Sequence, residues 1–368
     1  MLETKREPFI IRHAAPEDAL ALTDTIARID EETEFLGVPG EFRQRWADGF
    51  AERLKTMGEN GTGAYVLAAH DGEIIGFLGA FAGMIDRARG VIYIAHVGIR
   101  RAWRGRGVGA ALFAAIEAWA RGQGAWRLEL RVDEENARGL ALYRKRGFAV
   151  EGRIVDAASM DGAWRNHLWM AKELRRFAQP PWAPLELPAN GQSPRERAPL
   201  VRRVRLEDAA LVRRFEQELL GETPFLLKQP HEVRDDEAAR KEFAEQVDQP
   251  TCLLLAAVIA GAQGERIVGY ANAAREVPTR MHHNAFALVN VLRAHWGLGL
   301  GQDLAARIEG WAREQNIRRL TTALSAHNTR ALRFATARGF RQEVFSPRYA
   351  VIDGRAVDRV RMGKILAP

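Results

Sequence analysis

The chain has 368 residues, 47% of them hydrophobic and 27% charged, as expected for a soluble globular protein of about two domains. Its single cysteine, Cys252, excludes an intramolecular disulfide and a cysteine-based zinc site, and it favours a reducing compartment. The first residues lack the apolar core of a signal peptide, and the apolar run that starts at Cys252 is about half as long as a membrane helix. We therefore expect a cytoplasmic protein without membrane segments, in which this run is a buried strand.

The net charge of +7 lies in the second half of the chain. Residues 1–196 hold 27 Lys and Arg against 27 Asp and Glu, whereas residues 197–368 hold 27 against 20. The excess arginines are spread along expected helices and are not clustered on one face or interleaved with aromatic residues, as a nucleic-acid surface would require. A solvated basic surface is the simpler interpretation, and nucleic acid is not favoured as a partner.

Hydrophobic periodicity and turn residues predict the elements of the first half in chain order. A strand at 9–14 precedes helices at 16–32 and 40–57, and strands at 64–70 and 73–82 flank an Asp71–Gly72 hairpin turn. A strand at 91–99, a glycine-rich loop and a helix come next, followed by a strand at 126–132, a helix at 135–147 and strands near 148–154 and 167–174. The apparently antiparallel start predicts a mixed α/β (α+β) sheet and not a doubly wound dinucleotide-binding fold.

The sequence contains an internal repeat. The stretch from Val97 to Phe148 aligns without gaps on the stretch from Val289 to Phe340 at a constant offset of 192 residues, and weaker similarity upstream has an offset of 190. We therefore predict a first domain at 1–177, a proline-rich linker at 178–199 and a second domain at 200–368. A linker of this length allows the two domains to pack as an intramolecular pseudo-dimer.

The segment "RGRGVGAAL" from Arg104 places alternate glycines before a helix. Glycines let the backbone approach a ligand, and the helix N-terminus with its free N–H groups favours an anion. No Gly-Lys-Ser/Thr follows, which excludes a P-loop. A dinucleotide fingerprint fits superficially, but Gln302 breaks it in the second copy. We therefore expect the loop to bind a pyrophosphate group.

This segment resembles the Q/R-x-x-G-x-G/A signature of the GNAT superfamily of N-acetyltransferases. The segment "ENARGLALYRKRGF" is similar to a second hallmark of that family, and the resemblance covers both copies. It implies two tandem GNAT-like domains that use acetyl-CoA, without a metal, to acetylate a primary amine of a small molecule or a protein N-terminus. The amine attacks the thioester directly in a ternary complex.

The resemblance also implies the cofactor site of the first copy. Backbone groups of the strand before the loop hold the pantetheine arm, and the loop itself holds the pyrophosphate. The implied cofactor-binding residues are Val97, Ile99, Arg104, Gly105, Arg106, Gly107, Val108, Gly109 and Asn136. For Asn136, a role as a helix cap is an equal alternative.

Three residues are candidates for proton transfer. Tyr143 matches the family's general acid, which protonates the departing thiolate, although its helical spacing also suits a core tyrosine. His96 and Glu129 are candidate bases, and each is equally interpretable as an ordinary polar residue. The acidic segment at 31–34 either attracts a cationic amine or forms a solvated helix end.

The second copy departs from the family pattern. Trp296 replaces Arg104 and Ala335 replaces Tyr143, so the acid is absent; His327 is either a substitute for it or an exposed turn residue. The implied cofactor-binding residues of this copy are Val289, Val291, Gly297, Gly299, Gly301 and Asn328. We therefore expect catalysis in the first domain. The alternative is a non-catalytic protein that binds or senses acyl-CoA.

Overall fold

A computed structural model describes residues 8–35, 49–83, 85–175, 199–261, 264–276 and 279–366. The chain divides into two compact units. The first comprises Met1–Met84 and Ala88–Ala178, and the second comprises Ile85–Arg87 and Gln179–Pro368. The predicted linker at 178–199, except for its last residue, lies outside the described residues, as does the start of the helix predicted at 40–57.

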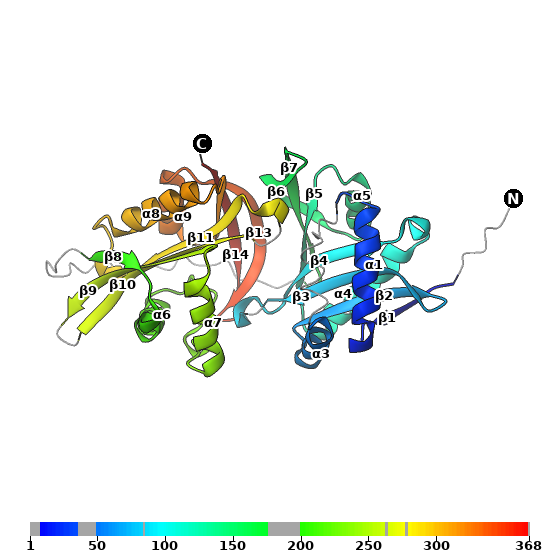
Figure 1. Cartoon of the computed structure of the whole chain (residues 1–368), viewed down its shortest axis with the longest axis horizontal. Coiled ribbons are helices and arrows are strands. Elements are labelled where there is room, and N and C mark those ends of the chain that lie inside the picture. The colour runs from blue at the N-terminus through cyan, green and yellow to red at the C-terminus, as the bar shows by residue number, and fades with distance from the viewer. Residues whose placement is uncertain are drawn as a thin grey trace. The chain divides into compact units, whose positions relative to one another are not determined.

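The first unit is a mixed sheet with helices on both faces (Figure 1). Its elements are β1 Ile10–His13, α1 Ala19–Glu31, α3 Phe50–Asn60, β2 Gly63–His70, β3 Glu73–Ala82, β4 Val91–Ile99, α4 Val108–Gly122, β5 Arg127–Asp133, α5 Ala137–Lys145, β6 Ala149–Met160 and β7 Ala163–Glu173. The strand order is β1-β2-β3-β4-β5-β7-β6. All neighbours are antiparallel except β4 and β5, which are parallel, so the predicted mixed sheet is confirmed.

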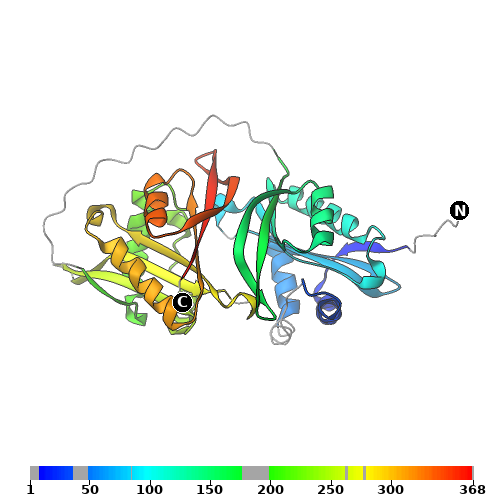
Figure 2. The same cartoon turned by 90° about the horizontal axis from the view of Figure 1, so that it is seen from above.

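Alternation along the strands divides the core of the first unit into two layers. On β2, Val66 and its neighbours two residues away pack with α4, while Tyr65 and Leu67 pack with α1 and α3. The sheet therefore lies between α1 and α3 on one side and α4 on the other (Figure 2). The Asp71–Gly72 turn joins β2 and β3 as expected, and both residues have positive φ angles of 47° and 81°.

The second unit repeats this plan. Its elements are β8 Leu200–Arg203, α6 Ala209–Glu222, α7 Glu237–Asp248, β9 Cys252–Gly261, β10 Gly264–Arg275, β11 Asn284–Val291, α8 Leu300–Glu314, β12 Arg319–Ser325, α9 Thr329–Ala337, β13 Arg341–Ile352 and β14 Arg355–Ile365. The strand order is β8-β9-β10-β11-β12-β14-β13, and β11 and β12 are parallel. The apolar run from Cys252 is β9 and is mostly buried, as predicted. Among the described residues, no helix is long and apolar enough to cross a membrane.

Candidate active site

The two parallel strands of the first unit separate halfway along their length. Strand β4 pairs with β5 only from Val91 to Ile94, although β4 continues to Ile99 and β5 to Asp133. Beyond Ile94, no strand among the described residues pairs with β4 on its β5 side. Val97 and Ile99, the residues predicted to contact the pantetheine arm, lie on this unpaired stretch.

A β-bulge at Ala95 decides which side chains of β4 face which layer. Gly79 pairs with His96 and Ala80 pairs with Ile94, so Ala95 is an extra residue on β4. Because the bulge reverses the alternation, Val97 packs in the α4 layer together with Ile94. His96 is thereby turned to the opposite face of the sheet, toward α1 and α3.

His96 is hydrogen bonded to a tyrosine two strands away. The Tyr65 hydroxyl lies 3.2 Å from His96 Nδ1, and the two residues are paired in one cross-strand row through Gly79. A Cβ on Gly79 would lie 2.6 Å from the Tyr65 ring, so only glycine lets the ring cross β3. Burial lowers the pKa of His96 to about 4, and burial also raises the pKa of Tyr65. The imidazole is therefore unprotonated at neutral pH.

The glycine loop presents unused N–H groups. Gly105 and Gly107 have φ angles of 78° and 93°, and the space above both is open. Gly107 is the N-cap of α4, whose first bond to the loop runs from the Ala111 N–H to the Gly107 carbonyl. Within the described residues, the N–H groups of Gly107, Val108 and Gly109 donate to no acceptor. These donors can hold an anion.

Arg104 is turned away from this loop opening. Its Nε donates to the Ile99 carbonyl at 3.0 Å, and its Nη2 lies 3.3 Å from Glu32 Oε2. The same Glu32 carboxylate accepts from the Arg101 backbone N–H and pairs with Arg100. The expected phosphate contact of the Arg104 side chain therefore has no support in the structure. Glu32 holds the loop in place, which argues against a role in attracting the amine.

Two other arginines are better placed to meet phosphate. Arg106 is exposed on the loop, 5.1 Å from the centre of the Trp103 ring. Arg138, on the first turn of α5, is exposed and close enough to affect the pKa of Arg104. Sequence analysis missed Arg138, although Arg330 occupies the same position in the second copy at the 192-residue offset.

Two residues predicted to bind the cofactor, Gly109 and Asn136, have structural roles within the protein. Gly109 lies inside α4, where an added Cβ would be 3.0 Å from Leu142 and 3.1 Å from Ile99, so it permits close helix packing. The Asn136 side chain accepts a hydrogen bond from the Gly139 N–H at 2.9 Å and caps α5. The capping alternative for Asn136 is thus realised.

Tyr143 projects from α5 into the α4 layer of the core. Its ring lies 5.7 Å from that of Phe113 and 6.2 Å from that of Phe148. Burial raises the pKa of Tyr143 to about 12, which keeps its hydroxyl protonated well above neutral pH. Among the described residues, none forms a hydrogen bond with this hydroxyl. Tyr143 therefore has the protonation state that a general acid needs.

Glu129 is a core residue. Its side chain is 2% exposed, its carboxylate lies 2.8 Å from Arg127 Nε, and Arg127 also pairs with Glu151. Separating a buried carboxylate from the buried guanidinium that it neutralises is strongly destabilising. The prediction of Glu129 as a base therefore loses its support, and His96 is the better placed candidate.

The second unit keeps the loop geometry. Gly297 and Gly299 both have φ angles of 80°, and Gly299 is the N-cap of α8. Asn328 caps α9 through the Ala331 N–H, as Asn136 caps α5. Val289 and Val291 pack in the α8 layer of the core. Strands β11 and β12 also separate, since they pair only from Asn284 to Phe286.

The second unit has other residues at the positions of the proposed proton-transfer groups. Its pairing of β10 with β11 is continuous, so β11 has no bulge. The row that corresponds to Tyr65, Gly79 and His96 holds Leu254, Asn272 and Leu288. Ala335, in the place of Tyr143, is buried against Val360 and Met362.

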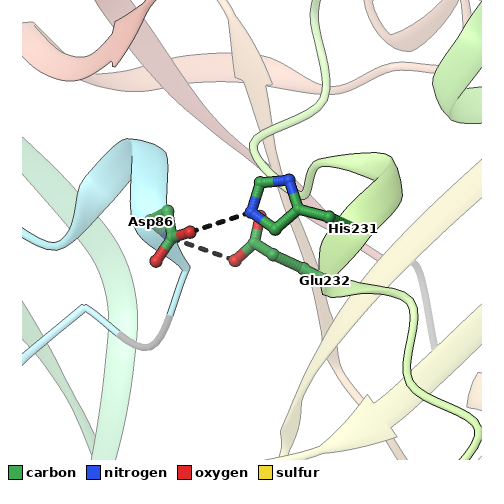
Figure 3. A group of neighbouring side chains, drawn as sticks. All are labelled: Asp86, His231 and Glu232. Carbon is green, nitrogen blue, oxygen red and sulfur yellow. Dashed lines mark hydrogen bonds and ion pairs between the residues drawn. The ribbon is translucent and has the colours of Figure 1, made fainter.

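A separate polar cluster belongs to the second unit. Asp86 Oδ2 lies 3.1 Å from His231 Nε2, and the Asp86 N–H donates to Glu232 at 3.0 Å (Figure 3). Asp86 and His231 are exposed, and the two carboxylates already have partners. We assign no ligand to this cluster.

Comparison with known proteins places this architecture in one class. The family model described as the acetyltransferase (GNAT) family matches residues 27–148 and again residues 215–340. The L-amino acid N-acetyltransferase AaaT of Escherichia coli K12 is 28% identical over 171 residues, which cover 44% of this chain and 96% of that protein.

Solved structures of acetyltransferases also match the chain. A GNAT acetyltransferase of Streptococcus pneumoniae has a TM-score of 0.42 and 25% identity, and it covers 45% of this chain and 100% of its own. A putative acetyltransferase of Salmonella typhimurium, determined with its cofactor acetyl-CoA, has a TM-score of 0.41 and 19% identity over 48% of this chain and 99% of its own.

The family model matches both copies and more than half of the chain, so the protein is an N-acetyltransferase of the GNAT family. It is a tandem member of that family, since each copy is matched separately.

Proposed function

We propose that the first unit transfers the acetyl group of acetyl-CoA to the primary amine of a small molecule, and that an L-amino acid is the leading candidate. A protein N-terminus is the other acceptor class with a primary amine. The similarity to an L-amino acid N-acetyltransferase supports the choice of acceptor. The observation that carries the proposal is the row of Tyr65, Gly79 and His96 beside the separated strands, which the second unit lacks.

In the proposed reaction, a neutral amine attacks the thioester carbonyl and forms the C–N bond. The nitrogen then becomes strongly acidic, and His96 accepts its proton. With the Nδ1–H of His96 donated to the Tyr65 hydroxyl oxygen, Nε2 carries the lone pair that takes this proton. Backbone groups of Val97 and Ile99 hold the pantetheine arm, and a backbone N–H of β4 polarises the carbonyl.

The C–S bond breaks as the tetrahedral adduct collapses, and the thiolate leaves. Tyr143 donates its proton to this sulfur and is reprotonated from solvent. Because burial raises the pKa of Tyr143 to about 12, its hydroxyl is protonated at neutral pH and available to the sulfur as the C–S bond breaks. Arg106, Arg138 and the N–H groups at the start of α4 hold the pyrophosphate.

We further propose that the second unit binds acetyl-CoA without turnover, because its loop retains the open N–H groups and its core lacks the proton-transfer residues. The second candidate function for the whole chain, acyl-CoA binding or sensing without catalysis, draws on the same observation. Packing of the two domains as a pseudo-dimer remains a prediction from the repeat.

The test is acetyl-CoA-dependent thiol release with a panel of L-amino acids and with peptides that carry a free N-terminus. We expect turnover with at least one amino acid, and loss of that turnover in Tyr143→Phe with acetyl-CoA binding retained. Acetyl-CoA binding without turnover on either panel would favour the sensing function. Absence of acetyl-CoA binding would refute both.

A further inference from the structure

We propose that the first residue of the glycine-loop signature, Arg104 in the first unit and Trp296 in the second, is a positioning residue that locks the loop to the end of the preceding strand. This inference rests on the proposed binding of acetyl-CoA by the loops. We assign the lock to the side-chain N–H that both units share, since the second contact of Arg104, to Glu32, needs a charge that Trp296 does not carry.

The two units make the same bond with different side chains. Arg104 Nε donates to the Ile99 carbonyl at 3.0 Å, and Trp296 Nε1 donates to the Val291 carbonyl at 2.7 Å. Ile99 and Val291 are the last residues of β4 and β11. A guanidinium and an indole both carry an N–H donor on a planar group at a similar distance from the backbone, but only the guanidinium is charged. The feature preserved between the two copies is therefore the hydrogen-bond donor.

A second anchor is also repeated. The Glu32 carboxylate, just after α1, accepts from the Arg101 N–H, and the Glu222 carboxylate, at the end of α6, accepts from the Arg293 N–H at 2.7 Å. Each loop is therefore held at its first turn by a carboxylate and at its fourth residue by a side-chain donor. This leaves the loop glycines and the helix N-terminus oriented before a ligand arrives.

Preorganisation predicts the effect on binding. When the loop is already ordered, less of the binding free energy is lost in ordering it. Removal of the side-chain hydrogen bond should therefore weaken acetyl-CoA binding without removing a ligand contact. Loss of one hydrogen bond of this kind corresponds to roughly a tenfold weaker Kd. Replacement by another planar N–H donor should preserve the Kd.

The experiment is calorimetric titration of the full chain with acetyl-CoA at several salt concentrations, in a Gly299→Val background that silences the second loop. Arg104→Trp keeps a donor and removes the charge, whereas Arg104→Met removes both. We expect Arg104→Trp to bind within about threefold of the parent, Arg104→Met to bind about tenfold more weakly, and the salt dependence of Kd to be the same in all three. Equal weakening in both variants, with a reduced salt dependence, would show that Arg104 acts by its charge and would overturn the proposal.

The second loop provides a matched pair. Trp296→Arg should leave amide hydrogen exchange at Gly297–Leu300 unchanged, and Trp296→Phe, which keeps the ring and loses the N–H, should speed it about tenfold. Equal exchange in both variants would overturn the lock in this unit. If the parent chain binds no acetyl-CoA, the proposed function fails, while the exchange result still decides the lock.

Discussion

The Tyr65 hydroxyl reaches His96 Nδ1 across an intervening strand at a distance of 3.2 Å. The contact needs Gly79, which leaves room for the ring, and a histidine at position 96, which faces this side because Val97 beside it packs in the α4 layer. The second unit meets neither requirement, since the same row is Leu254, Asn272 and Leu288. The two copies of one fold thus differ in the part of the sheet where proton transfer is proposed.

Removal of the base should lower the rate and not the affinity for acetyl-CoA. We expect His96→Gln to reduce kcat/KM for the amine about 10²–10⁴-fold, because a positioned base contributes this much. Tyr65→Phe keeps the imidazole of His96 and removes its hydrogen-bond partner, so kcat/KM should fall less, by about tenfold. Steady-state kinetics with titration of acetyl-CoA check this, and wild-type kcat/KM in His96→Gln would remove His96 from the mechanism.

Loss of the acid should have a comparable effect at a later step. Tyr143→Phe is expected to lower kcat about 10²–10⁴-fold while the Kd for acetyl-CoA changes by less than about threefold. The matched control is Tyr93→Phe, which removes a tyrosine hydroxyl from neighbouring β4. Equal turnover in the Tyr143→Phe and control variants would leave Tyr143 as a core residue only.

The two glycine loops should be separately removable. We expect about two equivalents of acetyl-CoA to bind the wild-type chain, and one to bind either Gly107→Val or Gly299→Val, because a β-branched residue at these positive φ angles is strained. Calorimetric stoichiometry measures this, with NAD as the control ligand. One equivalent in wild type, lost in Gly107→Val and kept in Gly299→Val, would show that the second loop does not bind.

The third glycine of each loop should respond differently to alanine. An added Cβ at Gly109 would meet Leu142 at 3.0 Å, so Gly109→Ala should destabilise the first unit by about 1–2 kcal/mol. At Gly301 the nearest atom is Phe334 at 3.5 Å, so Gly301→Ala should be neutral or stabilising by up to about 1 kcal/mol. Urea unfolding without ligand compares the two, and equal effects would contradict the difference in packing.

Acid should destabilise the wild-type chain partly through His96. The folded state holds the pKa of His96 at about 4, below the unfolded value near 6.5, so the contribution to stability is full above pH 6.5 and is lost as the pH falls toward 4. Between pH 7 and pH 5, the free energy of unfolding should fall by about 1–2 kcal/mol more in wild type than in His96→Gln. His167, whose pKa burial lowers to about 3, is present in both and cancels. An identical pH dependence would show that His96 is solvated.

The sequence alone was sufficient to predict the features that depend on a few consecutive residues or on the repeat. The 192-residue offset revealed two copies, the Asp71–Gly72 turn marked a hairpin, and alternate glycines marked a loop with positive φ angles before a helix. These features depend on backbone conformations available only to certain residues, on strand alternation and on helix N-termini, all of which act over a few residues and so leave a pattern in the sequence.

Only the tertiary structure decided what the individual side chains do. Arg104 turned out to bind a strand-end carbonyl, Glu129 to neutralise Arg127, and His96 to meet Tyr65. These outcomes depend on which strands lie side by side and on ion pairs between residues far apart in the chain, so they could not be derived from sequence spacing. The bulge at Ala95, which puts Ile94 and Val97 in the same layer, could likewise not be derived from sequence spacing.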